Sequence, residues 1–152
     1  MKTPRHRRYG GSARTTLADY IAENARAWVS SWLEEVRRDP ATAHYASYGD
    51  TEELIRDTEA LYHYLALWLR TGSWDPRIDT HYHRIGRDRR ERGFPLGEVA
   101  RAILLAKRHL WKGIADEQRL SVALELEMAK AIAMFYDEAI YHTILGYEGR
   151  DT

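Results

Sequence analysis

Apolar residues recur along most of the chain at steps of three and four, the spacing of an α-helix that packs on one side. Over residues 15–38, one such stripe is formed by Leu17, Ile21, Ala25, Trp28, Trp32 and Val36. Pro40 ends this helix, because the residue before a proline is disfavoured in the helical conformation. No stretch alternates apolar and polar residues as a half-buried strand does, so the pattern predicts an all-α fold.

Local signals mark the ends of two more helices. Asp50 is suited to cap a helix with Glu53 in the capping-box position, and Gly72 is suited to end it. Its apolar face is Leu54, Thr58, Leu61, Leu65 and Leu69, broadened by Trp68. Asp75 and Pro76 open the next helix, which Gly93 ends. The inward stripe of that helix is Ile78, Tyr82 and Ile85, with Arg89 falling on the same stripe.

Two helices are predicted in the last third of the chain. The first covers residues 97–111 and is ended by Gly113. The second is the longest, from Asp116 or Leu120 to Leu145, with Gly146 as its stop. One of its faces carries Leu120, Leu124, Met128, Ala131, Phe135 and Ala139, and another carries Val122, Leu126, Ala129, Ala133, Tyr136 and Ile140. A helix that is apolar on two sides is expected to contact two partners, its own core and a second subunit.

Size and composition fit one domain of about five to six helices over residues 15–148. Residues 1–14 are basic and are expected to be a disordered tail, and residues 149–152 to begin a linker or tail. A formal net charge of zero disfavours nucleic acid as a partner. The chain has no cysteine, no signal peptide and no apolar run of membrane-spanning length, so we expect a soluble cytoplasmic domain.

No residues are spaced as a catalytic or metal site requires, so we predict no enzyme activity and no metal. His81 and His83 would face different ways on a helix, and no HExxH pattern occurs. His109 and His142 lie beside apolar stripes, where a histidine could hold haem iron from one side. Asp137 or Glu138 could face inward, in which case each needs an arginine partner from the cluster Arg84, Arg87, Arg89 and Arg90.

Aromatic residues are numerous: five tryptophans, ten tyrosines and two phenylalanines. Core packing explains most of them, because large rings dominate buried area. The alternatives are a pocket for a flat or apolar ligand and an aromatic dimer face. The candidate ligand-pocket residues are Trp68, His109 and Phe135.

A scattered set of residues carries a resemblance to a known family. It comprises Trp28, Asp39-Pro40, Trp68-Leu69, Gly72, Tyr82, Ile85-Gly86-Arg87, Arg90, Gly93, Pro95-Leu96, Glu98-Val99, Leu104-Leu105, Arg108, Leu110-Trp111, Phe135-Tyr136-Asp137, Ala139, Tyr141 and Gly146-Tyr147-Glu148. From Leu17 to Glu148 the chain resembles the N-terminal domain of the RsbR-type co-antagonists of the kinase RsbT, which build the bacterial stressosome. The motif residues that we carry forward are Tyr82, Gly86, Arg87, Arg90, Gly93, Trp111, Asp137, Tyr141, Gly146 and Tyr147.

The resemblance implies a dimeric, non-haem, globin-like sensory domain that passes a stress signal to a C-terminal effector domain. Globin-coupled sensors show a pattern similar to Arg84-Ile85, with a haem-binding histidine four residues after the isoleucine and a glycine four residues later. Here Ile85 and Gly93 fit that pattern, but Arg89 occupies the histidine position. An arginine side chain has no free lone pair for iron, so the comparison favours the non-haem branch.

We therefore predict a homodimeric sensory or scaffold domain of a bacterial stress-signalling regulator, without a cofactor and with protein partners in a signalling complex. The alternatives are a sensor that binds haem or another apolar ligand, and the input domain of a PucR-type transcriptional regulator or a histidine kinase. The sequence leaves open the signal, the partner protein and the output domain that we expect after Thr152.

Overall fold

The computed structural model describes residues 2–150, with side chains for residues 13–122 and 124–150. Its elements in chain order are α1 (Lys2–Arg38), the 3-10 helix η1 (Pro40–Ser47), α2 (Thr51–Thr71), α3 (Pro76–Glu91), α4 (Leu96–Asp116), α5 (Gln118–Ala123) and α6 (Leu126–Glu148). These residues include no β-strand, which confirms the all-α prediction.

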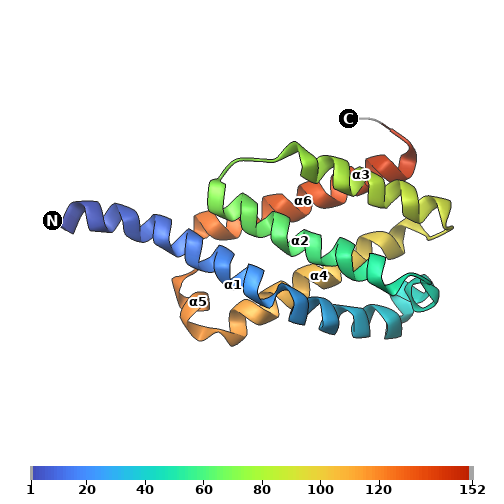
Figure 1. Cartoon of the computed structure of the whole chain (residues 1–152), viewed down its shortest axis with the longest axis horizontal. Coiled ribbons are helices and arrows are strands. Elements are labelled where there is room, and N and C mark those ends of the chain that lie inside the picture. The colour runs from blue at the N-terminus through green and yellow to red at the C-terminus, as the bar shows by residue number, and fades with distance from the viewer. Residues whose placement is uncertain (1, 151–152) are drawn as a thin grey trace.

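The helices surround one core that is rich in tyrosine. Helix α1 packs along α2 and also contacts α4, while α3 and α6 form the most extensive helix pair (Figure 1). The largest side chains that are fully enclosed are Tyr45, Tyr62, Tyr82, Tyr136 and Phe135. The helical turns of η1 close the bundle between α1 and α4, and they bring Tyr45 and Tyr48 into the core.

The predicted helix starts at Asp50 and Asp75 are confirmed. The carboxylate of Asp50 accepts a hydrogen bond from the amide of Glu53 at 3.0 Å, and that of Asp75 accepts one from the amide of Arg77 at 2.9 Å. Gly72 ends α2 in the left-handed conformation, with φ of 67°, which glycine adopts without steric cost. The reciprocal half of the capping box is absent among the described contacts, because the Glu53 carboxylate binds Tyr48 and Arg92 instead.

Three predicted boundaries are wrong. The long last helix is two helices, because Leu124 and Glu125 have extended backbone between α5 and α6. Gly113 does not end α4, which continues to Asp116, and Gly146 lies inside α6, which continues to Glu148. Both glycines serve close packing: a β-carbon on Gly113 would lie 2.4 Å from the Trp28 ring, and one on Gly146 would meet the carbonyl oxygen of His83 at 2.1 Å.

Helix α1 is also longer than predicted, since its backbone is helical from Lys2 and not from Thr15 or Thr16. The side chains of residues 2–12 lie outside the described part of the chain, as do residues 151–152. The disordered basic tail over residues 1–14 and the linker from residue 149 therefore stay predictions.

Helices α3 and α6 cross with their backbones in contact. A β-carbon on Gly86 of α3 would lie 2.0 Å from the carbonyl oxygen of Thr143 on α6, just as one on Gly146 would meet α3. Only glycine at both positions permits this approach. The crossing fixes the roll of α3 about its axis, and so it directs Tyr82, Ile85 and Arg89 into the core.

Candidate functional site

The most unusual feature of the core is a buried arginine. Arg89 lies on the inward stripe of α3, one turn after Ile85, and only 3% of the residue is exposed. A charged group in this position loses its hydration, so it needs counter-charges and hydrogen-bond acceptors from the protein. The sequence prediction that Arg89 faces inward is confirmed.

The partners of Arg89 come from three elements. Its Nη1 donates to Asp88 Oδ2 at 2.6 Å and to the hydroxyl of Tyr48 at 3.1 Å. Its Nη2 lies 3.8 Å from Asp57 Oδ2 on α2, which is an ion pair without a direct hydrogen bond. The guanidinium carbon also lies 4.9 Å from the centre of the Tyr48 ring and 5.9 Å from that of Tyr45, within the range of cation–π attraction.

A wider network holds these partners in place. Asp57 Oδ1 accepts a hydrogen bond from Arg84 Nη2 at 2.8 Å, and the Tyr48 hydroxyl donates to Glu53 Oε1 at 2.7 Å. Arg92 closes the network by donating to Asp88 at 2.9 Å and to Glu53 at 2.9 Å. Cations and carboxylates alternate through the network, so the charge of Arg89 is balanced locally.

The electrostatic environment keeps the central groups in one protonation state. Burial by itself would lower the pKa of Arg89, but Tyr45, Tyr48 and Asp88 act against it and raise the pKa above its ordinary value. Burial raises the pKa of Tyr48, and its hydrogen bond to Glu53 raises it further. At neutral pH the guanidinium is therefore charged and the Tyr48 hydroxyl keeps its proton.

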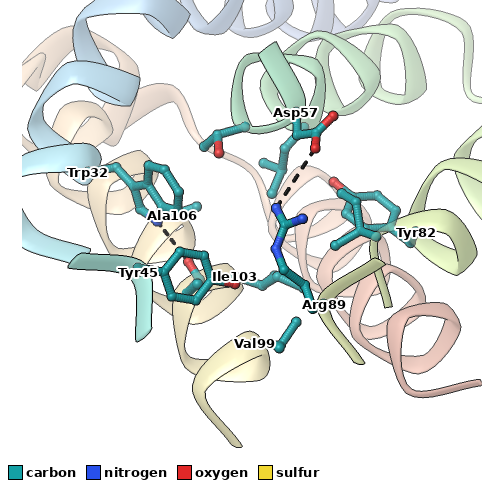
Figure 2. A pocket seen from close by; sticks show the side chains of 12 residues that line it. Trp32, Tyr45, Asp57, Tyr82, Arg89, Val99, Ile103 and Ala106 are labelled. Carbon is teal, nitrogen blue, oxygen red and sulfur yellow. Dashed lines mark hydrogen bonds and ion pairs between the residues drawn. The ribbon is translucent and has the colours of Figure 1, made fainter. Parts of the chain in front are cut away.

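A cavity of about 40 Å³ lies beside the Arg89 guanidinium. Figure 2 shows Asp57 and Tyr82 facing the guanidinium on one side, with Trp32 and Tyr45 across the cavity. Its remaining walls are mainly aliphatic and come from α2, α3 and α4. Five elements thus meet around one charged group and one small space.

The family model of the RsbT co-antagonist protein rsbRD N-terminal domain matches residues 22–150. The chain belongs to this family. Comparison with curated proteins and with solved structures found no match. Family membership makes the chain a domain of a stress-signalling regulator.

Half of the ten motif residues that we carried forward lie where α3 meets α6. Gly86 and Gly146 form the helix crossing. Arg90 donates to the carbonyl oxygen of Tyr147 at 2.8 Å, and the Tyr147 hydroxyl donates to the carbonyl oxygen of Phe94 at 2.6 Å, next to Gly93 with its φ of 83°. In this chain Arg90 and Tyr147 thus link the end of α3 to the end of α6.

The other motif residues have separate positions. Tyr82 is buried beside the cavity, and Trp111 is half-buried against the core. Arg87, Asp137 and Tyr141 are exposed. Asp137 is therefore not an inward carboxylate.

The three candidate ligand-pocket residues do not meet in one place. Trp68 and Phe135 both contact Trp74, with ring centres 5.3 Å and 5.9 Å apart, so they belong to one aromatic cluster. His109 lies elsewhere, with Nε2 2.8 Å from Glu35 Oε1. None of the three lines the cavity beside Arg89.

The sequence interpretation missed Asp57, Tyr45 and Tyr48 as members of the Arg89 site. Asp57 could have been found, because it lies three residues after Leu54 and four before Leu61, on the apolar stripe of α2. A carboxylate on such a stripe indicates a buried counter-charge. The two tyrosines carry no comparable signal, since η1 reaches the core only through its tertiary contacts.

Within the described residues, no three histidine, aspartate or glutamate side chains are grouped as metal ligands would be. No described helix is both long and apolar enough to cross a membrane.

Proposed function

We propose that this chain is the sensory and dimerisation domain of an RsbR-like stress regulator, and that it signals through a symmetric pair of helices. One observation carries the proposal. All four large hydrophobic residues that are exposed in the described part of the chain lie on α5 and α6: Val122, Leu126, Met134 and Tyr141, with exposures of 81%, 69%, 45% and 52%. Leu126, Met134 and Tyr141 recur at steps of eight and seven residues, which places them on one face of α6. Apolar surface concentrated on one face is typical of a protein interface.

The occupant of this face that fits best is a second copy of the chain. If the α6 helices of two copies lie antiparallel, with the two-fold axis between Ala133 and Met134, each outward residue faces an outward residue of the partner. In that arrangement Leu126 faces Tyr141 of the partner, and Lys130 faces Asp137 of the partner. A two-fold interface requires such self-complementarity, with each contact made twice.

The face belongs to the helix that α3 contacts through its glycines, which supports a signalling role. Movement of α6 against α3 would change the direction in which the chain leaves the domain after Glu148. Small shifts of packed helices at subunit interfaces are a known way to transmit a signal. We propose that the protein partners are those of an RsbT-type signalling complex in the cytoplasm, and that the chain catalyses no reaction.

The proposal includes a globin-like arrangement that functions without haem. Arg89 occupies the position expected for a haem ligand, and its guanidinium is committed to Asp88, Tyr48 and Asp57. The adjoining cavity of about 40 Å³ is far smaller than a porphyrin. These residues do not fit haem, so the geometry favours a sensor that responds by other means.

Light scattering after size exclusion tests the dimer. We expect the wild-type chain to be a dimer at micromolar concentration and Met134→Glu to be a monomer with an unchanged helical circular dichroism spectrum. The matched control is Ala27→Glu, which places the same charge on an exposed face of α1. A monomeric wild type, or a dimer that survives Met134→Glu, contradicts the proposal.

Charge exchange tests the antiparallel register. Lys130→Asp and Asp137→Lys should each weaken the dimer, because each places like charges opposite one another. The double variant restores opposite charges and should recover most of the affinity. No recovery in the double variant would place the two-fold axis elsewhere on α6.

A further inference from the structure

The cavity beside Arg89 is lined by residues that carry buried polar atoms without a hydrogen-bond partner in the described part of the chain. Arg89 Nε, Asp57 Oδ2 and the Tyr82 hydroxyl are all buried, and none has a hydrogen-bond partner within the described part of the chain. All three residues line the same cavity (Figure 2). Buried polar groups are nearly always paired, so three unpaired atoms around one space indicate that something else binds there.

The size of the cavity limits the occupant. A single water needs roughly 10–15 Å³ of such space. The cavity of about 40 Å³ therefore has room for about three waters, or for one molecule of about four non-hydrogen atoms. A flat aromatic ligand is too large.

The polar atoms limit its chemistry. Arg89 Nε carries a hydrogen and can only donate, whereas Asp57 Oδ2 as a carboxylate oxygen can only accept. An occupant that satisfies both must accept one hydrogen bond and donate another. The hydroxyl of Tyr82 adapts to either role, since it both donates and accepts.

The local charge balance excludes a strongly charged occupant. The guanidinium of Arg89 already has Asp88 at 2.6 Å and Asp57 at 3.8 Å. An added anion would face these two carboxylates, and an added cation would face the guanidinium, both in surroundings that screen charge poorly.

We propose that the cavity binds a small neutral molecule of the amide or urea type. Its carbonyl oxygen accepts from Arg89 Nε, and its N–H group donates to Asp57 Oδ2. This inference rests on the proposed sensory function, because the molecule bound in the cavity is then the signal that the domain senses. The occupant would join Asp57 on α2 to Arg89 on α3. Binding would therefore stiffen the contact between α2 and α3, and α3 is the helix that crosses α6.

Titration with three molecules of equal size tests the chemistry. Acetamide, acetone and acetate each have about four non-hydrogen atoms, a size for which dissociation constants are no tighter than about 40 µM. The readout is the NMR resonance of the Arg89 Nε–H group, which Arg89→Lys assigns by removing it. We expect a saturable shift with acetamide below about 50 mM, and binding at least tenfold weaker for acetone, which cannot donate, and for acetate, which is charged.

Two variants locate the binding. Ala106→Leu fills the cavity and keeps all three polar groups, so it should abolish the acetamide shift. Ala27→Leu adds the same atoms on an exposed face of α1, away from both the cavity and the proposed dimer face, and should leave the shift unchanged. If Ala106→Leu fails to fold, Val99→Leu fills the same space from another wall. Tyr82→Phe should weaken acetamide severalfold.

An absent acetamide shift, tighter binding of acetate, or an acetamide shift that persists in the filled cavity overturns the inference. These results leave the dimer measurement untouched, because the cavity and the outward face of α6 do not share a residue. A wild-type chain that is monomeric but still binds acetamide would instead contradict only the proposed signalling through a dimer.

Discussion

Replacing Gly86 with alanine tests whether direct backbone contact between α3 and α6 holds the bundle together. A β-carbon at this position would lie 2.0 Å from the carbonyl oxygen of Thr143 and 2.7 Å from the amide nitrogen of Tyr147. An ordinary carbon–oxygen contact is about 3.3 Å, so the helices must separate by about 1.3 Å. Because both obstructing atoms are backbone atoms of α6, no side-chain rotation can relieve the contact.

The expected loss of stability follows from two opposing effects. Adding a methyl group to a packed core costs about 1–3 kcal/mol, and a clash with backbone belongs at the upper end of that range. Alanine is the better helix former by about 1 kcal/mol, which offsets part of the cost. We therefore expect Gly86→Ala to lower the free energy of unfolding by about 2 kcal/mol. For a chain of this size the melting temperature should fall by about 4–8 °C.

Urea and thermal unfolding followed by circular dichroism measure this change. The matched control is Gly97→Ala in the first turn of α4, where nothing lies within 4 Å of the added β-carbon. There only helix propensity acts, so the control should be unchanged or more stable by up to about 1 kcal/mol. If Gly86→Ala is as stable as Gly97→Ala, the close crossing of α3 and α6 is refuted.

Gly146→Ala provides an internal check on the same contact. Its β-carbon would meet the carbonyl oxygen of His83 at 2.1 Å, so it should destabilise the fold as Gly86→Ala does. One separation of the helices relieves both clashes, so the double variant should lose less stability than the sum of the two single variants. Simple additivity would mean that the two glycines occupy independent sites.

Four other substitutions test individual buried or half-buried groups. Gly113→Ala would place a β-carbon 2.4 Å from the Trp28 ring, and thermal unfolding should show that the free energy of unfolding falls by about 1–3 kcal/mol. The loss should be smaller than for Gly86→Ala if the Trp28 ring can rotate away. Tyr136→Phe removes a buried hydroxyl without a partner in the described chain and should be neutral or stabilising in urea unfolding. Tyr62→Phe removes a 2.7 Å hydrogen bond to the carbonyl oxygen of Ala106 and should lower the free energy of unfolding by about 1 kcal/mol. Equal effects of Tyr136→Phe and Tyr62→Phe would contradict a hydrogen bond at the Tyr62 hydroxyl and none at the Tyr136 hydroxyl. Burial lowers the pKa of His81 below 6.5, so the unfolded chain binds more protons and stability from this group is lost as the pH falls below about 6.5. His81→Asn should flatten urea-measured stability over that range, and an unchanged slope would show that His81 does not contribute to it.

Local sequence signals predicted the helix starts and the inward face of α3. Asp50 and Asp75 cap helices because their carboxylates reach amides two or three residues ahead, which needs no tertiary contact. Arg89 follows Ile85 by one turn, so the helical period alone places it inward. These features depend on residues that are neighbours in the chain, and for that reason they could be read from the sequence.

Only the tertiary structure determined the structural role of the glycines and which residues surround Arg89. Gly113 and Gly146 have the residue type of helix stops, but each is needed where another element comes within contact distance of the helix backbone. The break between α5 and α6 at Leu124 and Glu125 contains neither glycine nor proline, so no local sequence signal predicts it. Asp57, Tyr45 and Arg89 are far apart in sequence, and their meeting depends on how the helices cross. Periodicity determines which face of a helix is buried, whereas only packing determines what that face will touch.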